Sequence, residues 1–491
     1  MTMRRPNNRR RRRRLAVFLP VLLAACTVGP DYVKPDAASP VVYKEAGDAW
    51  KQAEPKDGID RGAWWSIYND PVLDGLEKQI EASNQTLAQS EAAYRQAVAL
   101  VAEADATFYP TASVAPSVTR SKGSSGISGV KVQPVTQYSA AATATWAPDL
   151  WGKVRRTVEA DVDTAQADAA NIASARLLAQ ATLASDYYQL RGTDQLKTLL
   201  DDTVAAFTRS LKITKDQYEA GTAQKSDVIT ALTQLESAQS QEINTGVLRA
   251  TLEHAIAVLV GKPPSDLTIE PAKLTDQVPV TPTGVASRLL ERRPDIADAE
   301  RLVAAANAQI GVAISAFYPD LTLTGSYGFT SPTLGALFSA ANTVWSVGGS
   351  LSETVFDAGS RSAAVAAARA NYDQTVANYR QTVLAAFQQV EDELATLRIL
   401  EKQAVVEADT VKQAKLAVEL FINEYKAGTV AYTSVVTAQA TALTEEEAEL
   451  TILQDRLVAS VTLIQALGGG WTSDLLPPAG HLDQAEADKG E

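Results

Sequence analysis

The chain is 491 residues long, is 46% hydrophobic and carries a formal net charge of −13. An acidic chain repels the phosphates of nucleic acids, so no nucleic-acid partner is expected. One cysteine and two histidines exclude an intramolecular disulfide and make a poor metal site, and no cofactor is expected. No apolar run reaches the roughly 18 residues that indicate a transmembrane helix.

Residues 1–25 have the pattern of a secretory signal peptide. Eight arginines precede the short apolar run LAVFLPVLL, and two small alanines follow it. The segment Leu23-Ala-Ala-Cys26 resembles the lipobox of bacterial lipoproteins, in which the leader is cut before the cysteine and the cysteine is lipidated. An ordinary signal peptide with a chance cysteine is the alternative. Loss of the leader changes the net charge from −13 to −21.

Three landmarks recur in the same order along the chain. The segments ADATFYPTASV and AISAFYPDLTL place Pro110 and Pro319 at a spacing of 209 residues. The segments YEAGTAQKSDVITA and YKAGTVAYTSVVTA begin at Tyr218 and Tyr425, 207 residues apart. VLVGK and ALGGG then end the two halves at a spacing of 208. These spacings predict a duplicated unit of about 200 residues.

Each unit is predicted to contain one helix, two strands and two longer helices. The first helix covers residues 71–107 in one half and 294–317 in the other, and proline ends each. Period-two alternation then predicts strands in TASVAPSVT, QYSAAATATW, TLTGSYGF and WSVGGSLS. One face of these strands is apolar and the other carries serine and threonine. This pattern fits outer-membrane barrel strands, although composition alone favours a soluble antiparallel sheet.

Very long helices follow the strands. Residues 361–427 contain neither glycine nor proline, and Gly192 is the one such residue in 157–220. Gly221 and Gly428, each within a Tyr-x-Ala-Gly-Thr segment, are expected to end these helices with a left-handed residue. A second helix begins at once in each half, over residues 224–260 and 431–467. The sequence therefore predicts two helical hairpins that pack along their length.

CTVGPDY from Cys26, the SAFYPD segment, LERRPDI from Leu290, the paired AGT turns and ALGGGW resemble the TolC family of outer-membrane efflux ducts, most closely its lipoprotein branch of the NodT or OprM type. The resemblance implies an α+β membrane protein and a homotrimer. Four strands from each subunit would form a shared twelve-stranded barrel, continued by a long periplasmic α-helical barrel. The expected segments are a leader (1–25), a lipidated equatorial segment (26–69), the first repeat (70–262), a linker (263–291), the second repeat (292–471) and an acidic tail (472–491).

The function that the resemblance implies is passive conduction of drugs or other small molecules across the outer membrane of a Gram-negative bacterium. The partners would be outer-membrane lipid, a periplasmic adaptor and an inner-membrane pump, usually of the RND type. A polypeptide duct of type I secretion is the closest alternative, and a coiled-coil structural lipoprotein explains the strands less well. Gly261-Lys262 lacks the upstream glycine of a P-loop, and a histidine on a helix such as His254 is more often a structural or surface residue than a base, so an enzyme is not expected.

The candidate site residues fall into four groups. Cys26 is the lipidation site. The predicted lipid face of the barrel comprises Tyr138, Trp146, Leu323, Tyr327, Trp345 and Val347. The periplasmic tip, where the duct would narrow and meet the adaptor, comprises Tyr218, Gly221, Thr222, Tyr425, Gly428 and Thr429.

The fourth group is the aperture. Several family ducts carry aspartates after the second turn. The matching positions here are Val430, Ser434 and Thr437, which leaves Asp227 of the first repeat as the acid near the aperture. Asp227 either faces the pore or complements the dipole of its helix.

Overall fold

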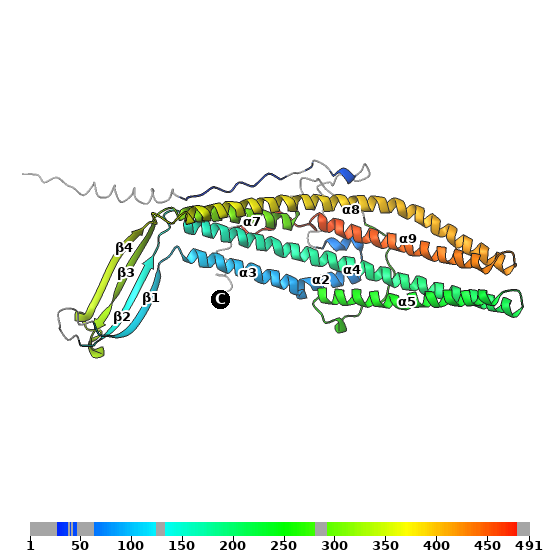
Figure 1. Ribbon diagram of the computed structural model, residues 1–491, viewed down its shortest axis with the longest axis horizontal. Helices are drawn as coiled ribbons and strands as arrows, with labels where there is room; N and C mark the ends of the chain where they lie inside the picture. The colour runs from blue at the N-terminus through cyan, green and yellow to red at the C-terminus, as the bar shows by residue number, and fades with distance from the viewer. Residues whose placement is uncertain are drawn as a thin grey trace, which may run out of the picture.

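The structure is a computed structural model of the chain, and it describes residues 27–37, 40, 43–46, 63–123, 133–279 and 292–478. The molecule is long and narrow, with a four-stranded sheet at one end and helices along the rest of its length (Figure 1). The leader and Cys26 lie outside the described residues, as do residues 280–291 of the linker and 479–491 of the tail.

The two repeats contain the same elements in the same order. The first comprises α3 (Gln85–Ala106), β1 (Thr111–Ser121), β2 (Val135–Trp146), α4 (Lys153–Glu219) and α5 (Lys225–Leu259). The second comprises α7 (Pro294–Ser315), β3 (Asp320–Ser331), β4 (Thr343–Ser352), α8 (Ser360–Lys426) and α9 (Tyr432–Ala466). Corresponding helices match in length at 22, 67 and 35 residues. A helix of 67 residues extends about 100 Å at about 1.5 Å per residue.

The first helical segment differs from its prediction. Residues 71–107 form two helices, α2 (Pro71–Ser83) and α3, rather than one. Asn84 separates them with an extended backbone of φ −68° and ψ 122°. Its side chain accepts the Leu87 amide at 2.9 Å and donates to the Leu259 carbonyl at 2.8 Å. Asparagine thus begins α3 and ties it to the end of α5, since its short amide can cap a helix.

The four strands form one antiparallel sheet in the order β1-β2-β3-β4. Each repeat supplies a hairpin, and the pairing of β2 with β3 joins the two repeats. Strands β1 and β4 are therefore the two edges of the sheet within one subunit. The strand predictions are confirmed at all four positions, with ends that extend by a few residues.

Helix α4 packs against α3, α5, α7 and α9, while α8 packs against α7 and α9. The largest core lies where the short 3-10 helix η2 (Trp64–Tyr68) and α2 cover α4, and it buries Trp64, Tyr187 and Tyr188. A separate cluster lies near the far end of the hairpins. Among the described residues, no helix combines the length and the apolar character needed to cross a membrane.

Candidate functional site

The six predicted lipid-face residues lie on one face of the sheet. Directly opposite residues in a sheet share a face, and so do alternate residues of one strand. Trp146 lies opposite Leu323, and Tyr327 lies opposite Trp345. Tyr138 and Val347 join the same face by alternation along β2 and β4. Tyr327, Trp345 and Val347 are between 56% and 80% exposed, so this face is uncovered in the single subunit.

The opposite face carries hydroxyl groups that bond across the strands. Ser117 and Ser139 pair through their Oγ atoms at 2.7 Å, and Ser326 and Ser346 do so at 2.8 Å. Small hydroxyl side chains that bond to one another leave this face polar without adding net charge. An apolar face and a face rich in hydroxyl groups on one sheet suit a wall between lipid and water.

Aromatic rings gather where the strands meet the helices. The Trp146 indole donates to the Phe108 carbonyl at 2.9 Å, and the Trp151 indole donates to the Pro319 carbonyl at 2.8 Å. Trp151 also stacks on Tyr318, with ring centroids 4.9 Å apart. These bonds fix the angle between strands and helices, and they place amphipathic rings at the level where a membrane interface is expected.

Two tight turns of the same geometry form the other end of the molecule (Figure 1). Gly221 and Gly428 have φ values of 78° and 74°, which favour glycine. After each, a threonine donates both its amide and its hydroxyl to one carbonyl of the preceding helix. Thr222 bonds Gln217 in this way, and Thr429 bonds Glu424, at 2.9 to 3.0 Å. The AGT segments are thus helix-ending turns, as the sequence predicts.

The two tip tyrosines have different surroundings. Tyr218 is 46% exposed, whereas Tyr425 is 7% exposed and lies against Tyr432, with ring centroids 5.1 Å apart. Tyr425 and Tyr432 belong to a cluster with Phe207 and Leu211 of α4. The other predicted tip residues, Gly221, Thr222, Gly428 and Thr429, are exposed.

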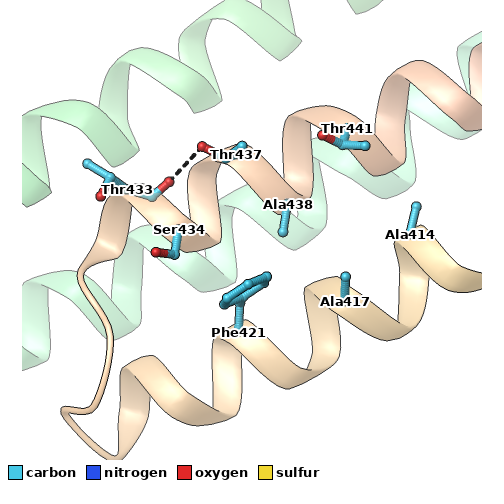
Figure 2. Close-up of a pocket in the computed structure, with 8 residues that line it drawn as sticks. All are labelled: Ala414, Ala417, Phe421, Thr433, Ser434, Thr437, Ala438 and Thr441. Atoms are coloured by element: carbon cyan, nitrogen blue, oxygen red, sulfur yellow. Dashed lines mark hydrogen bonds between the residues drawn. The ribbon is translucent and has the colours of Figure 1, made fainter.

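Two of the predicted aperture residues line a shallow groove between α8 and α9. Figure 2 shows Ser434 of α9 on the side toward Phe421 of α8, while the Thr437 hydroxyl donates to the Thr433 carbonyl of its own helix. The groove has a volume of about 420 Å³ and is otherwise lined mainly by alanine and threonine. Val430 is half-buried in the turn and packs against the cluster of Tyr425 and Tyr432. Which of these residues border the pore stays a prediction.

Asp227 occupies a helix-capping position. Its Oδ2 atom accepts the backbone amide of Gln224 at 3.2 Å, and the Gln224 side chain makes the reciprocal bond of a capping box. Burial raises the pKa of Tyr425 and of Tyr432 at the second turn, and the charge of the Asp227 carboxylate adds a smaller contribution to both. This geometry supports the helix-end interpretation of Asp227, while its relation to a pore stays a prediction.

The sequence did not reveal how the segment after Cys26 is held. Gly29, with φ 101°, lies so close to Gly311 of α7 that an added Cβ would be 2.5 Å from its Cα. Arg156 of α4 is buried beneath this segment, donates to the Val28 carbonyl at 3.3 Å and pairs with Asp31 at 3.1 Å. The contact joins residues over 120 positions apart, so no local pattern could have indicated it.

A second unpredicted network holds the start of the linker. Asp194 is buried and pairs with Arg249 at 2.8 Å and with Arg191 at 3.2 Å. Both arginines also donate to linker carbonyls, those of Ile269 and Glu270. Each charge is paired and hydrogen-bonded, which offsets the cost of its burial. The linker therefore begins as a fixed strap across α4 and α5.

Glu77 of α2 is also unexpected. It is fully buried, and within the described part of the chain neither of its carboxylate oxygens has a hydrogen-bond partner. Burial, reinforced by the nearby charges of Asp74 and Glu81, raises the pKa of Glu77 to about 9. The group is therefore neutral at pH 7. Leu73, Leu76 and Ile80 of the same helix belong to the largest apolar core.

Comparison with known proteins agrees with this architecture. The family model described as Outer membrane efflux protein matches residues 76–262 and 285–469. The chain is 31% identical over 459 residues to the antibiotic efflux pump outer membrane protein ArpC of Pseudomonas putida, covering 92% of this chain and 94% of that protein. It is 28% identical over 464 residues to the pyoverdine export outer membrane protein OpmQ of Pseudomonas aeruginosa, covering 92% and 96%. The solved outer-membrane channel OprN is 28% identical with a TM-score of 0.85, covering 91% of this chain and all of that one.

Proposed function

The chain belongs to the outer membrane efflux protein family, and we propose that it is the outer-membrane duct of a tripartite pump, with an RND-type inner-membrane pump and a periplasmic adaptor as its partners. The protein is an outer-membrane efflux channel and not an enzyme. It has the trimeric fold in which four strands per subunit contribute to a shared twelve-stranded barrel. The proposal concerns the pump class, the adaptor and the cargo.

One observation carries the proposal. A sheet with an apolar face and a hydroxyl-lined face continues directly into two helical hairpins whose longer helices extend about 100 Å. Unpaired strand edges are not tolerated in hydrocarbon, so β1 and β4 require neighbouring subunits. The predicted lipid-face residues then meet the bilayer, and the hydroxyl face meets the water of the duct.

Drugs and other small molecules are the proposed cargo. The two relatives above are named for different cargoes, an antibiotic in one case and pyoverdine in the other. On the described sheet, the face that would line the duct is rich in small hydroxyl side chains such as the paired Ser117 and Ser139, which fit many compounds alike. Selection would therefore fall to the pump, with the adaptor sealing the path to the helical tip.

Deletion of the gene in its own host tests this function. We expect higher drug susceptibility, restored by the gene in trans, and co-purification of an adaptor and an RND pump with the cross-linked protein. Purified protein should also form conducting pores in planar bilayers. Unchanged drug susceptibility together with loss of a secreted polypeptide would instead assign the duct to type I secretion.

We also propose that Cys26 carries a lipid anchor, although it lies outside the described residues. Thr27 follows it in place of the aspartate that retains lipoproteins in the inner membrane. Cys26→Ser should abolish acyl labelling while much of the processed protein stays membrane-bound, because the barrel holds it independently. A fully soluble Cys26→Ser protein would contradict the membrane role of the sheet.

A further inference from the structure

The contact between the two repeats inside one subunit provides a template for the contact between subunits. Strand β2, the last strand of the first repeat, pairs with β3, the first strand of the second. The register places Tyr138 opposite Ser331 and Trp146 opposite Leu323. Beside the sheet, Trp151 after β2 stacks on Tyr318 before β3. The end of one repeat thus fits the beginning of the next.

The outer ends of the subunit present the same two surfaces without a partner. Tyr109 precedes β1 as Tyr318 precedes β3, yet Tyr109 is 72% exposed and Tyr318 is 38% exposed. Val355 and Phe356, in the segment after β4, are 94% and 85% exposed. Large apolar groups at both uncovered ends indicate an interface rather than a solvated surface.

The helices show the same difference. Ala160 of α4 is 2% exposed, and α4 packs against both α3 and α7. Its counterpart 207 residues later is Ala367 of α8, which is exposed. Helix α4 lies between α3 of its own repeat and α7 of the next repeat. Helix α8 packs against α7 of its own repeat, and within the described part of the subunit no corresponding helix lies on its other side. A neighbouring α3 would occupy that position, because α3 and α7 are corresponding helices of equal length.

The duplication determines which residues of β4 and of a neighbouring β1 would lie opposite each other. Thr111 pairs with Thr145 in the first hairpin, and Asp320 pairs with Ser352 in the second. Corresponding residues of the first strands, β1 and β3, are therefore 209 positions apart in the sequence, and those of the second strands, β2 and β4, are 207 positions apart. Adding 207 to the number of a β2 residue gives its counterpart in β4, and subtracting 209 from the number of a β3 residue gives its counterpart in β1. The observed β2–β3 register therefore predicts a register for β4 with a neighbouring β1.

In the shared barrel β4 of one subunit meets β1 of the next, and we propose that the antiparallel register of this seam places Ser350 opposite Ser117, Leu351 opposite Pro116 and Gly349 opposite Val118. The partner is a second copy of this chain, so the proposal rests on the shared barrel and adds its register. The same transfer brings Ala358, the counterpart of Trp151, to Tyr109 of the next subunit.

The two faces of the sheet agree with this register independently. Ser117 lies on the hydroxyl face, where it bonds Ser139. Ser350 lies on the same face, because it alternates with Ser346, which bonds Ser326. Leu351 and Pro116 both lie on the apolar face. A register shifted by one residue would place hydroxyl groups opposite apolar groups along the whole seam.

Paired cysteines test the register in membranes of cells that express the full chain. Directly opposite residues bring Cβ atoms to about 4.5–5.5 Å, near the range for a disulfide, while a shift of two residues adds about 7 Å along the strand. Mild oxidation of Ser117→Cys/Ser350→Cys should convert most of the monomer band into reducible covalent dimer and trimer. The matched pairs Ala115→Cys/Ser350→Cys and Thr119→Cys/Ser350→Cys should leave most of the chain monomeric.

Two further variants make each outcome decisive. Ser139→Cys/Thr330→Cys, a pair opposite each other within one subunit, should link without forming oligomers, which shows that the sheet has folded. Val118→Cys/Gly349→Cys, on the apolar face of the same register, should also link neighbouring subunits. Strongest linking at position 115 or 119 would overturn the register and leave the barrel intact. No linking between subunits for any pair, with the control intact, would overturn the β4–β1 seam and the shared barrel together.

Discussion

The two hairpin tips have the same turn but different supports. In both, a glycine at positive φ ends the long helix and a threonine closes the turn. At the first tip, the next helix is capped by Gln224 and Asp227, and Tyr218 remains exposed. At the second, Ala431 provides no side-chain cap, and Tyr432 buries Tyr425 against the first hairpin. The first tip is stabilised mainly within itself, and the second mainly by packing.

This difference arises at two positions of the repeat. Lys225 in the first tip corresponds to Tyr432 in the second, and Asp227 corresponds to Ser434. A lysine and a capping carboxylate suit a helix start in water, while a tyrosine beside an uncapped start requires a partner surface. The buried bond from the Gln439 side chain to Ser210 of α4, at 2.9 Å, adds to that support. The start of α9 therefore depends on packing between the hairpins, whereas the start of α5 also has a side-chain cap of its own.

The largest effect is expected from a change that removes the glycine at positive φ, which both turns share. Proline holds φ near about −65°, so Gly221→Pro and Gly428→Pro cannot form either turn as observed. Both variants should lose drug resistance in a host deleted for this gene, while still running as trimers in size-exclusion chromatography. Gly221→Ala and Gly428→Ala are the controls, since an added Cβ meets no atom within 4 Å and costs roughly 1–2 kcal/mol of backbone strain. Normal resistance with both prolines would remove the tips from pump coupling.

The second prediction tests whether the two tips differ in how far they depend on the buried ring of Tyr432. Tyr432→Ala removes a ring that is 3% exposed, at a local cost of about 3–5 kcal/mol by analogy with other aromatic truncations. Amide hydrogen exchange should accelerate most in residues 428–440 and less in residues 221–235, because the first tip also has a side-chain cap of its own. The matched variant Tyr218→Ala, at an exposed ring, should change neither region. Equal acceleration in both regions would show that the tips are supported alike.

High pH should affect the second tip. Burial, with smaller contributions from Tyr425 and the charge of Asp227, raises the pKa of Tyr432 to about 12 from an ordinary value of 10.0. The folded tip thus holds this proton more tightly than the unfolded chain does. Its contribution to stability is complete below pH 10 and is lost as pH rises toward 12.

Spin labels at exposed positions 219 and 423, one on each hairpin, measure this loosening. The distance distribution between them should broaden from pH 9 to pH 11, because a charged tyrosinate is disfavoured in the cluster. Tyr432→Phe keeps the ring without the ionisable hydroxyl, so its distribution should change less. Identical broadening in the Phe variant would assign the effect to other groups.

The sequence predicted regular features better than singular ones. The long helices were readable because glycine and proline are nearly absent from them, and the turns were readable because AGT recurs at the same place in each repeat. The strand faces followed from strict alternation. The break at Asn84 was missed because one polar residue within a helical pattern does not reveal its distant partner, the Leu259 carbonyl.

Long-range polar contacts were invisible for the same reason. Arg156 beneath Val28 and the Asp194 network on the linker join segments that no local pattern relates. At the tips, the repeat showed which residues correspond, but it did not show that Tyr425 is buried and Tyr218 is exposed. That difference depends on the packing of one hairpin against the other.

The smallest expected effect concerns Asp227. Asp227→Asn removes the charge that complements the start of α5 and weakens the bond to the Gln224 amide, a change of about 0.3–1 kcal/mol. Hydrogen exchange should rise modestly over residues 224–230. Ser434→Asp, the reciprocal change, places a carboxylate three residues after Ala431, where it can accept that residue's amide and slow exchange at the start of α9.

Reversal potentials in a salt gradient across planar bilayers test whether Asp227 also faces the aperture. If Asp227 also faces the aperture, three like charges in the trimer attract cations, so Asp227→Asn should lower cation selectivity and Ser434→Asp should raise it. Unchanged selectivity in both variants would leave Asp227 with the capping role alone.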